Sequence, residues 1–138
     1  MKFATLPDGT EDGALLIVSR DLTRAAPAGD IAPNLLAALR DWDRSAPLLQ
    51  ARADQVEAGS AAGLIAFDPG AVTAPLPRAP QWLDGSAFLN HGRLMDKAFN
   101  KEPVADIDTV PLVYQGANVD FLGPCTPLAT PDEALNID

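Results

Sequence analysis

The chain of 138 residues has few cysteines and no long apolar runs, features that are typical of several common protein classes. It contains one cysteine, Cys125, so it cannot form an intrachain disulfide or a structural zinc site of three or four cysteines. A protein without disulfides is typical of the cytoplasm, where we expect this one. The N-terminus, MKFATLPDGTEDG, lacks the apolar run of a signal peptide, and no apolar run approaches the ~18 residues of a membrane span.

Basic residues are also scarce. Ten Lys and Arg stand against 19 Asp and Glu, which leaves a net charge of −9. Such a charge repels phosphate backbones and anionic lipid, so we expect neither a nucleic-acid nor a membrane partner. The phosphate-binding P-loop, the dinucleotide-binding glycine motif and the serine elbow of α/β-hydrolases are all missing, because the glycines stand apart from such patterns.

What the chain does contain predicts a folded domain of mixed structure. Apolar residues make up 47% of the chain, enough for a hydrophobic core. The 13 prolines and 10 glycines are too many for a helical bundle. We therefore predict an α+β fold.

The first part of the chain predicts a hairpin. Residues 2–6 and 14–19 are apolar segments typical of strands, and the turn-forming sequence PDGTEDG separates them. A helix is expected over 31–44, where apolar residues recur every three or four positions behind Asp30 as a possible cap.

A second helix is expected over 46–58. Ser45 is the predicted cap, Pro47 falls in the first turn, and Gly59 ends the helix. Together the hairpin and the two helices make a small N-terminal module.

The second part begins after a proline-rich connector, with a module boundary near residue 78. Asp84-Gly85 is predicted to be a turn that leads into a helix over 86–100. Strands are expected over 110–114 and 118–123, and the C-terminal tail is expected to be loop.

His91 and Asp84 are the first candidates for chemistry. His91 is the one histidine, the residue type that ionises near neutral pH. Asp84 lies seven residues earlier, so a helix through both would place them on one face, about 10 Å apart along its axis, with room for an ion and a water. By spacing alone, Asp84 as a helix cap and His91 as a surface residue are the more ordinary readings.

Two further residues are singular. Tyr114, the one tyrosine, ends an apolar strand before Gly116, where it could face a cleft or equally fill a core. Cys125 could pair with His91 as a nucleophile, but no basic residue lies near it in the sequence, so a structural role is favoured.

Three segments resemble a known family. QWLDGSAFLNH (81–91), PLVYQGANVDFLGP (111–124) and the final NID (136–138) resemble, in order and spacing, bacterial fumarylacetoacetate hydrolases. The opening of the chain resembles their small N-terminal domain. The resemblance implies an N-terminal domain over 1–78, followed over 79–138 by the opening part of a β-rich roll catalytic domain.

The resemblance also implies an activity. Members of the family hydrolyse a carbon–carbon bond of a β-diketone or acylpyruvate, with Mg²⁺ or Ca²⁺ held by carboxylates, and are usually dimers. Carried over by position, Asp84 corresponds to a metal ligand and His91 to the base that activates water. Tyr114 and Gln115 correspond to substrate contacts. The implied substrate is a small diketo acid.

This chain departs from the family pattern at several points. The family's two metal-binding glutamates follow a point that corresponds to Ile137-Asp138, and Leu94 stands where some relatives carry a glutamate after the histidine. One carboxylate does not hold Mg²⁺ firmly. We therefore expect the chain alone to be inactive, whether it is an artificially shortened protein, a truncated gene product, or a natural half completed by a homodimer or by a second chain.

Two other interpretations remain open. One is a non-catalytic binding or assembly module that uses residues after 78 as an interaction edge. The other stays within the superfamily, as a hydratase, isomerase or oxaloacetate decarboxylase, since the same metal stabilises the same enolate.

Overall fold

The computed structural model describes residues 1–86, 88–116, 121–129, 132 and 134. They belong to two compact units, one formed by Met1–Arg78 with Asp120–Asp138 and the other by Ala79–Val119. Both units combine helix and strand, which confirms the predicted α+β class.

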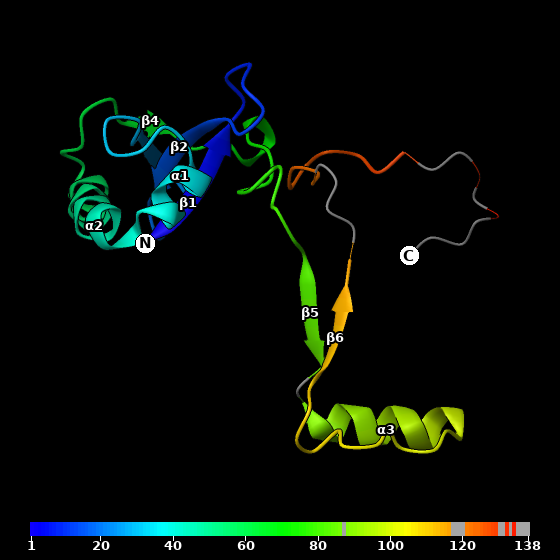
Figure 1. Cartoon of the computed structure of the whole chain (residues 1–138). Helices are drawn as coiled ribbons and strands as arrows, with labels where there is room; N and C mark the ends of the chain where they lie inside the picture. The colour runs from blue at the N-terminus through cyan, green and yellow to red at the C-terminus, as the bar shows by residue number, and fades with distance from the viewer. Residues whose placement is uncertain (87, 117–120, 130–131, 133, 135–138) are drawn as a thin grey trace. The chain divides into compact units, whose positions relative to one another are not determined.

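The first unit is built on an antiparallel sheet whose strands follow one another in chain order (Figure 1). The strands are β1 (Lys2–Leu6), β2 (Ala14–Val18), β3 (Arg24–Pro27) and β4 (Ile65–Ala66). The predicted hairpin is confirmed, because Lys2 lies opposite Val18 and Leu6 opposite Ala14. Strands β3 and β4 were not predicted, since β3 is short and rich in alanine, a poor strand former.

Strand β2 is apolar throughout because the sheet is covered on both faces. Leu15 and Ile17 point to the face that the helices cover, and Leu16 and Val18 point to the other. A strand buried on both sides has a continuous apolar sequence instead of an alternating one.

Two helices cover one face of this sheet, and both begin elsewhere than predicted. Helix α1 (Leu35–Arg40) is capped by Asn34, whose side chain accepts a hydrogen bond from the Ala37 N–H at 2.8 Å. The prediction of Asp30 as the cap of a helix over 31–44 is wrong. Pro33 is the physical reason, because a proline pushes the residue before it out of the helical region.

Helix α2 (Trp42–Ala58) begins earlier than predicted and ends where predicted. Ser45 is a buried residue inside the helix, so its predicted capping role is wrong. The extra turn is supported by Trp42, whose ring packs edge-on against Phe3 of β1 at 6.3 Å. Gly59 ends the helix in the left-handed conformation (φ 72°), as predicted.

The proline-rich connector follows β4 with a short 3₁₀ helix (Pro69–Ala71) and then runs along the open edge of β1. The Thr73 N–H donates to the Thr5 carbonyl at 3.0 Å, and the Thr5 hydroxyl donates to the Pro75 carbonyl at 2.7 Å. These bonds pair part of an edge that would otherwise be free.

The second unit contains β5 (Leu83–Ser86), α3 (Leu89–Phe99) and β6 (Leu112–Gln115). Strands β5 and β6 pair antiparallel as a two-stranded ribbon (Figure 1). The predicted turn at Asp84-Gly85 is wrong, because pairing with β6 holds both residues in a strand.

The other predictions for this part have mixed outcomes. The predicted helix over 86–100 begins three residues later, at Leu89. The predicted strand over 110–114 begins two residues later, at Leu112, and ends one residue later, at Gln115. In the predicted strand 118–123, residues 118–120 lie outside the described residues and 121–123 form no strand.

Candidate functional site

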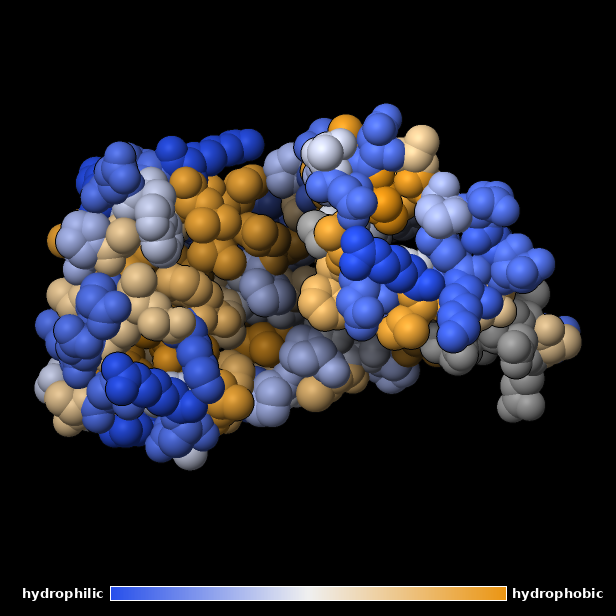
Figure 2. All heavy atoms as spheres, turned by 90° about the horizontal axis from the view of Figure 1, so that it is seen from below, coloured by the Kyte–Doolittle hydropathy of each residue, from blue (hydrophilic) through white to orange (hydrophobic). Residues whose placement is uncertain are grey.

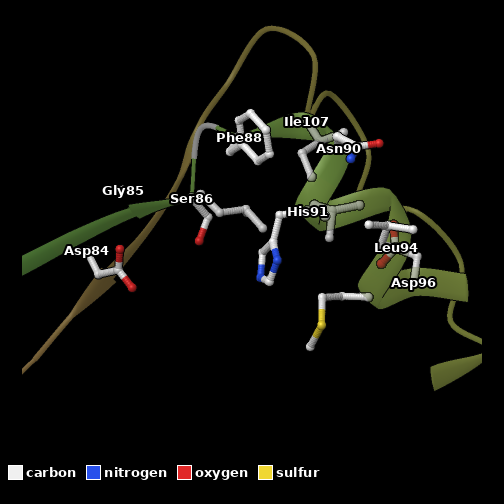
Figure 3. A pocket seen from close by; sticks show the side chains of 13 residues that line it. Asp84, Gly85, Ser86, Phe88, Asn90, His91, Leu94, Asp96 and Ile107 are labelled. Atoms are coloured by element: carbon white, nitrogen blue, oxygen red, sulfur yellow. The ribbon is translucent and has the colours of Figure 1, made fainter. Parts of the chain in front are cut away.

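A pocket of about 580 Å³ lies within the second unit (Figure 3). One part of its lining is polar and the rest is apolar. The polar and charged lining residues are Asp84, Ser86, Asn90, His91 and Asp96. The apolar ones are Phe88, Leu94, Met95, Val104, Ile107 and Leu112. The pocket therefore offers hydrogen-bonding groups and negative charge beside a hydrophobic wall, with no lysine or arginine among the residues that line it.

Asp84 and His91 both line this pocket, but they reach it from different elements. Asp84 lies on β5 and His91 in the first turn of α3, where its N–H donates to the Phe88 carbonyl at 3.0 Å. Figure 3 shows the carboxylate and the imidazole projecting toward the same open space. The prediction that one helix face carries both residues is wrong, because Asp84 belongs to a strand.

The loop after α3 closes another side of the pocket. Asp108 of this loop pairs with Arg93 at 3.1 Å, although both side chains are exposed. Ile107 lies against Gly92, where an added Cβ would come within 3.3 Å of the Ile107 Cδ1. The small residue beside His91 thus lets the loop approach α3 closely.

The described residues do not by themselves fit a bound Mg²⁺ or Ca²⁺. Within residues 1–86, 88–116, 121–129, 132 and 134, no three His, Cys, Asp or Glu side chains gather where they could hold a metal ion. Both ions require several oxygen ligands, and Asp84 supplies one carboxylate. We therefore derive no metal-dependent step from this part of the chain.

Tyr114 and Gln115 occupy opposite faces of the ribbon. Tyr114 lies directly opposite Asp84, so the two side chains share a face, whereas Gln115 lies opposite Leu83 on the other face. Both residues are exposed and neither lines the pocket. Of the two positions expected for Tyr114, a cleft or a core, the core is therefore wrong.

Three polar residues of the pocket were missed in the sequence: Ser86, Asn90 and Asp96. Ser86 follows Asp84 by two positions, and the two-residue period of a strand places both on one face. That signal was hidden by the prediction of a helix beginning at residue 86.

Cys125 is exposed, so burial in a core does not support the structural role that the sequence favoured. Among the described residues, no helix has the combination of length and apolar composition that crossing a membrane requires.

Comparison with known proteins places the first unit in a family. Residues 1–78 match the model of fumarylacetoacetase N-terminal domain 2, which is more than half of the chain. The chain belongs to this family. The family match ends where the second unit begins, so it includes the four-stranded sheet and its helices but not the pocket. No curated protein matches the chain.

Proposed function

We propose that the chain is the N-terminal portion of a fumarylacetoacetate-hydrolase-like enzyme that cleaves a carbon–carbon bond of a β-diketone or acylpyruvate. The observation that carries the proposal is the meeting of Asp84 and His91 at one pocket, in a chain whose residues 1–78 belong to the fumarylacetoacetase N-terminal family. Neither a strand carboxylate nor a helix histidine is unusual alone. Their convergence on one cavity is what a site for general acid–base chemistry requires.

In this proposal, His91 is the base. An imidazole beside an open cavity accepts a proton from water near neutral pH, and the hydroxide equivalent so formed attacks the substrate carbonyl. The adjoining carbon–carbon bond then breaks, its electron pair leaves with the enolate fragment, and the proton taken by His91 returns to the enolate carbon. Asp84 is one carboxylate of a metal site whose other ligands lie outside the described residues.

The present chain is proposed to be inactive alone, because among the described residues no three side chains gather as the ligand set that a dication needs. Completion by further catalytic-domain residues, from the same polypeptide, a second copy or a partner chain, supplies the remaining oxygen ligands. The proposed substrate is a small diketo acid, and the proposed location is the cytoplasm.

A decisive experiment joins the chain to the glutamate-bearing remainder of a fumarylacetoacetase-type catalytic domain. We expect Mg²⁺-dependent cleavage of acylpyruvates that is lost in His91→Ala and in Asp84→Asn. Lys97→Ala is the matched control, since Lys97 is an exposed residue of the same helix that does not line the pocket. Activity that survives His91→Ala would exclude His91 as the base.

A second candidate function, a non-catalytic assembly module, is favoured by one observation. None of the described residues from 79 to 116 is buried, and several large apolar side chains of this segment are exposed. Figure 2 shows hydrophobic residues, in orange, at the surface beside hydrophilic ones, in blue. A completed protein that is inactive with every diketo acid and unaffected by metal would favour this function over the first.

A further inference from the structure

Trp82 and Tyr114 form an aromatic pair on the β5–β6 ribbon. Their ring centroids lie 6.2 Å apart at an interplanar angle of 81°, an edge-to-face arrangement that the charge distribution of aromatic rings favours. Trp82 precedes Asp84 by two positions, and Tyr114 lies directly opposite Asp84. The period of an extended chain therefore puts all three side chains on one face.

The absence of a side chain at Gly116 leaves the space that the indole of Trp82 occupies. The Gly116 N–H donates to the Trp82 carbonyl at 2.9 Å, which continues the ladder of the ribbon by one pair. A Cβ added at Gly116 would lie 1.9 Å from Cε3 of the indole and 2.5 Å from Cζ3. The ring therefore rests directly on the glycine backbone, and any side chain at residue 116 would displace it.

We propose that Trp82 is a positioning residue for Tyr114. The indole packs on the backbone of Gly116 and against the phenol of Tyr114. This packing holds the phenol on the face of the ribbon that carries Asp84. Its importance for substrate binding rests on the proposed function and on the substrate contact that the family resemblance implies for Tyr114. The positioning itself concerns only residues of this chain.

The exposure of the two rings explains why a positioning residue is needed. The Tyr114 side chain is 64% exposed and Trp82 is 44% exposed, so no surrounding core restricts the phenol. An exposed side chain that no core surrounds samples several rotamers. The two-stranded ribbon that carries this one is itself only marginally stable. The neighbouring indole of Trp82 is then the main restraint on the orientation of the Tyr114 phenol.

The test uses the fact that the chain contains one tyrosine. Incorporation of 3-fluorotyrosine into the full 138-residue chain gives ¹⁹F signals from Tyr114 alone, and the ring current of a nearby indole shifts them. We expect the signal of the unsubstituted chain to differ clearly from that of the urea-unfolded chain. In Trp82→Ala it should move most of the way to the unfolded position, whereas Trp82→Phe, which keeps an aromatic ring, should retain part of the shift.

Two matched variants separate contact from ribbon stability. Leu83→Ala removes an exposed apolar side chain from the opposite face of the same strand and should leave the signal in place. Gly116→Ala keeps both aromatic residues, but its methyl group would occupy the space that the indole fills. It should therefore shift the ¹⁹F signal of Tyr114 as Trp82→Ala does. Trp42→Phe alters the other tryptophan, in the first unit, and should have no effect.

The proposal is overturned by any of three results. The signal of the unsubstituted chain could coincide with the unfolded one, Leu83→Ala could move it as far as Trp82→Ala, or Gly116→Ala could leave it unchanged. Because no activity is measured, failure here is distinct from failure of the proposed hydrolase. In a completed active enzyme, Trp82→Ala should raise KM more than it lowers kcat.

Discussion

Asp84 and His91 line one pocket from two different elements, strand β5 and helix α3. The carboxylate projects from a strand and the imidazole from a helix, so the pitch of a single helix does not bring them together. Their relative position therefore depends on the pairing of β5 with β6, since this pairing determines where β5 ends. A substitution that weakens the ribbon should disturb the site without touching either residue.

The first prediction concerns metal binding by the chain alone. Asp84 is one carboxylate without two companion ligands among the described residues, so Mg²⁺ and Ca²⁺ should bind with a Kd no tighter than about 1 mM. Isothermal titration calorimetry measures this directly, with Asp84→Asn as the comparison. Micromolar binding that disappears in Asp84→Asn would mean that the chain already assembles a metal site.

The second prediction compares two buried hydroxyl groups of the first unit. Among the described residues the Ser45 hydroxyl has no hydrogen-bond partner, whereas the Thr5 hydroxyl donates to the Pro75 carbonyl at 2.7 Å. Ser45→Ala should raise the free energy of unfolding by about 0.5–1.5 kcal/mol, since it removes an unpaired polar group and adds a better helix former. Thr5→Val should lower it by about 1–3 kcal/mol, because it leaves the Pro75 carbonyl unpaired.

Urea unfolding followed by circular dichroism measures both values. A loss of stability in Ser45→Ala as large as that in Thr5→Val would contradict the structure, because it would require a hydrogen bond at Ser45.

The third prediction concerns Arg52 on α2. Its side chain is largely covered, pairs with Asp30 at 2.8 Å and donates to the Pro27 carbonyl, so it connects α2 to the end of β3 and to the segment that follows. Arg52→Met keeps the apolar stem and removes the charge, and should cost about 1–3 kcal/mol of stability. Arg44→Met, which removes a more exposed ion pair with Asp41, should cost less than about 1 kcal/mol.

The two variants are compared by the same unfolding measurement at low and high salt. Equal losses in both would show that Arg52 contributes no more than a surface ion pair.

The fourth prediction concerns acid. Hydrogen bonds from the Ser19 hydroxyl and from the Thr23 hydroxyl and N–H lower the pKa of Asp21 to about 2. Because the pKa is lower in the folded chain than in the unfolded one, the ionised carboxylate stabilises the fold above the ordinary value of 3.8. This stabilisation is lost as the pH falls from that value through about 2.

Measurement of unfolding against pH should therefore show that Asp21→Asn loses stability relative to the unsubstituted chain near neutral pH, with the difference shrinking below pH 4. Thr23→Val, which removes one donor, should raise the pKa of Asp21 as followed by NMR. A difference between the two chains that is constant from neutral to acid pH would contradict this account.

Much of the first unit could be predicted from the sequence because its signals are local. Apolar segments around a turn predicted β1 and β2, and a glycine predicted the end of α2. The predicted helix starts were wrong, since Asn34 and Asp41 directly precede the observed helices and the predicted caps Asp30 and Ser45 do not.

The candidate site was predicted in part. Asp84 and His91 were singled out by residue type and by resemblance, and they do line one pocket. Ser86 was not, because its place in the pocket depends on β5 being a strand. No local pattern distinguishes a strand from a turn in the sequence LDGS, which contains two poor strand formers.

The sequence by itself determined the α+β class, the central hairpin and the identity of the acid–base candidates, since composition and short-range periodicity carry that information. Only the tertiary structure decided that Asp84 lies on a strand opposite Tyr114 and that the indole of Trp82 rests on Gly116. The reason is that strand pairing is a contact between distant segments. Here β5 and β6 are separated by the whole of α3, and no short-range pattern of the chain records their register.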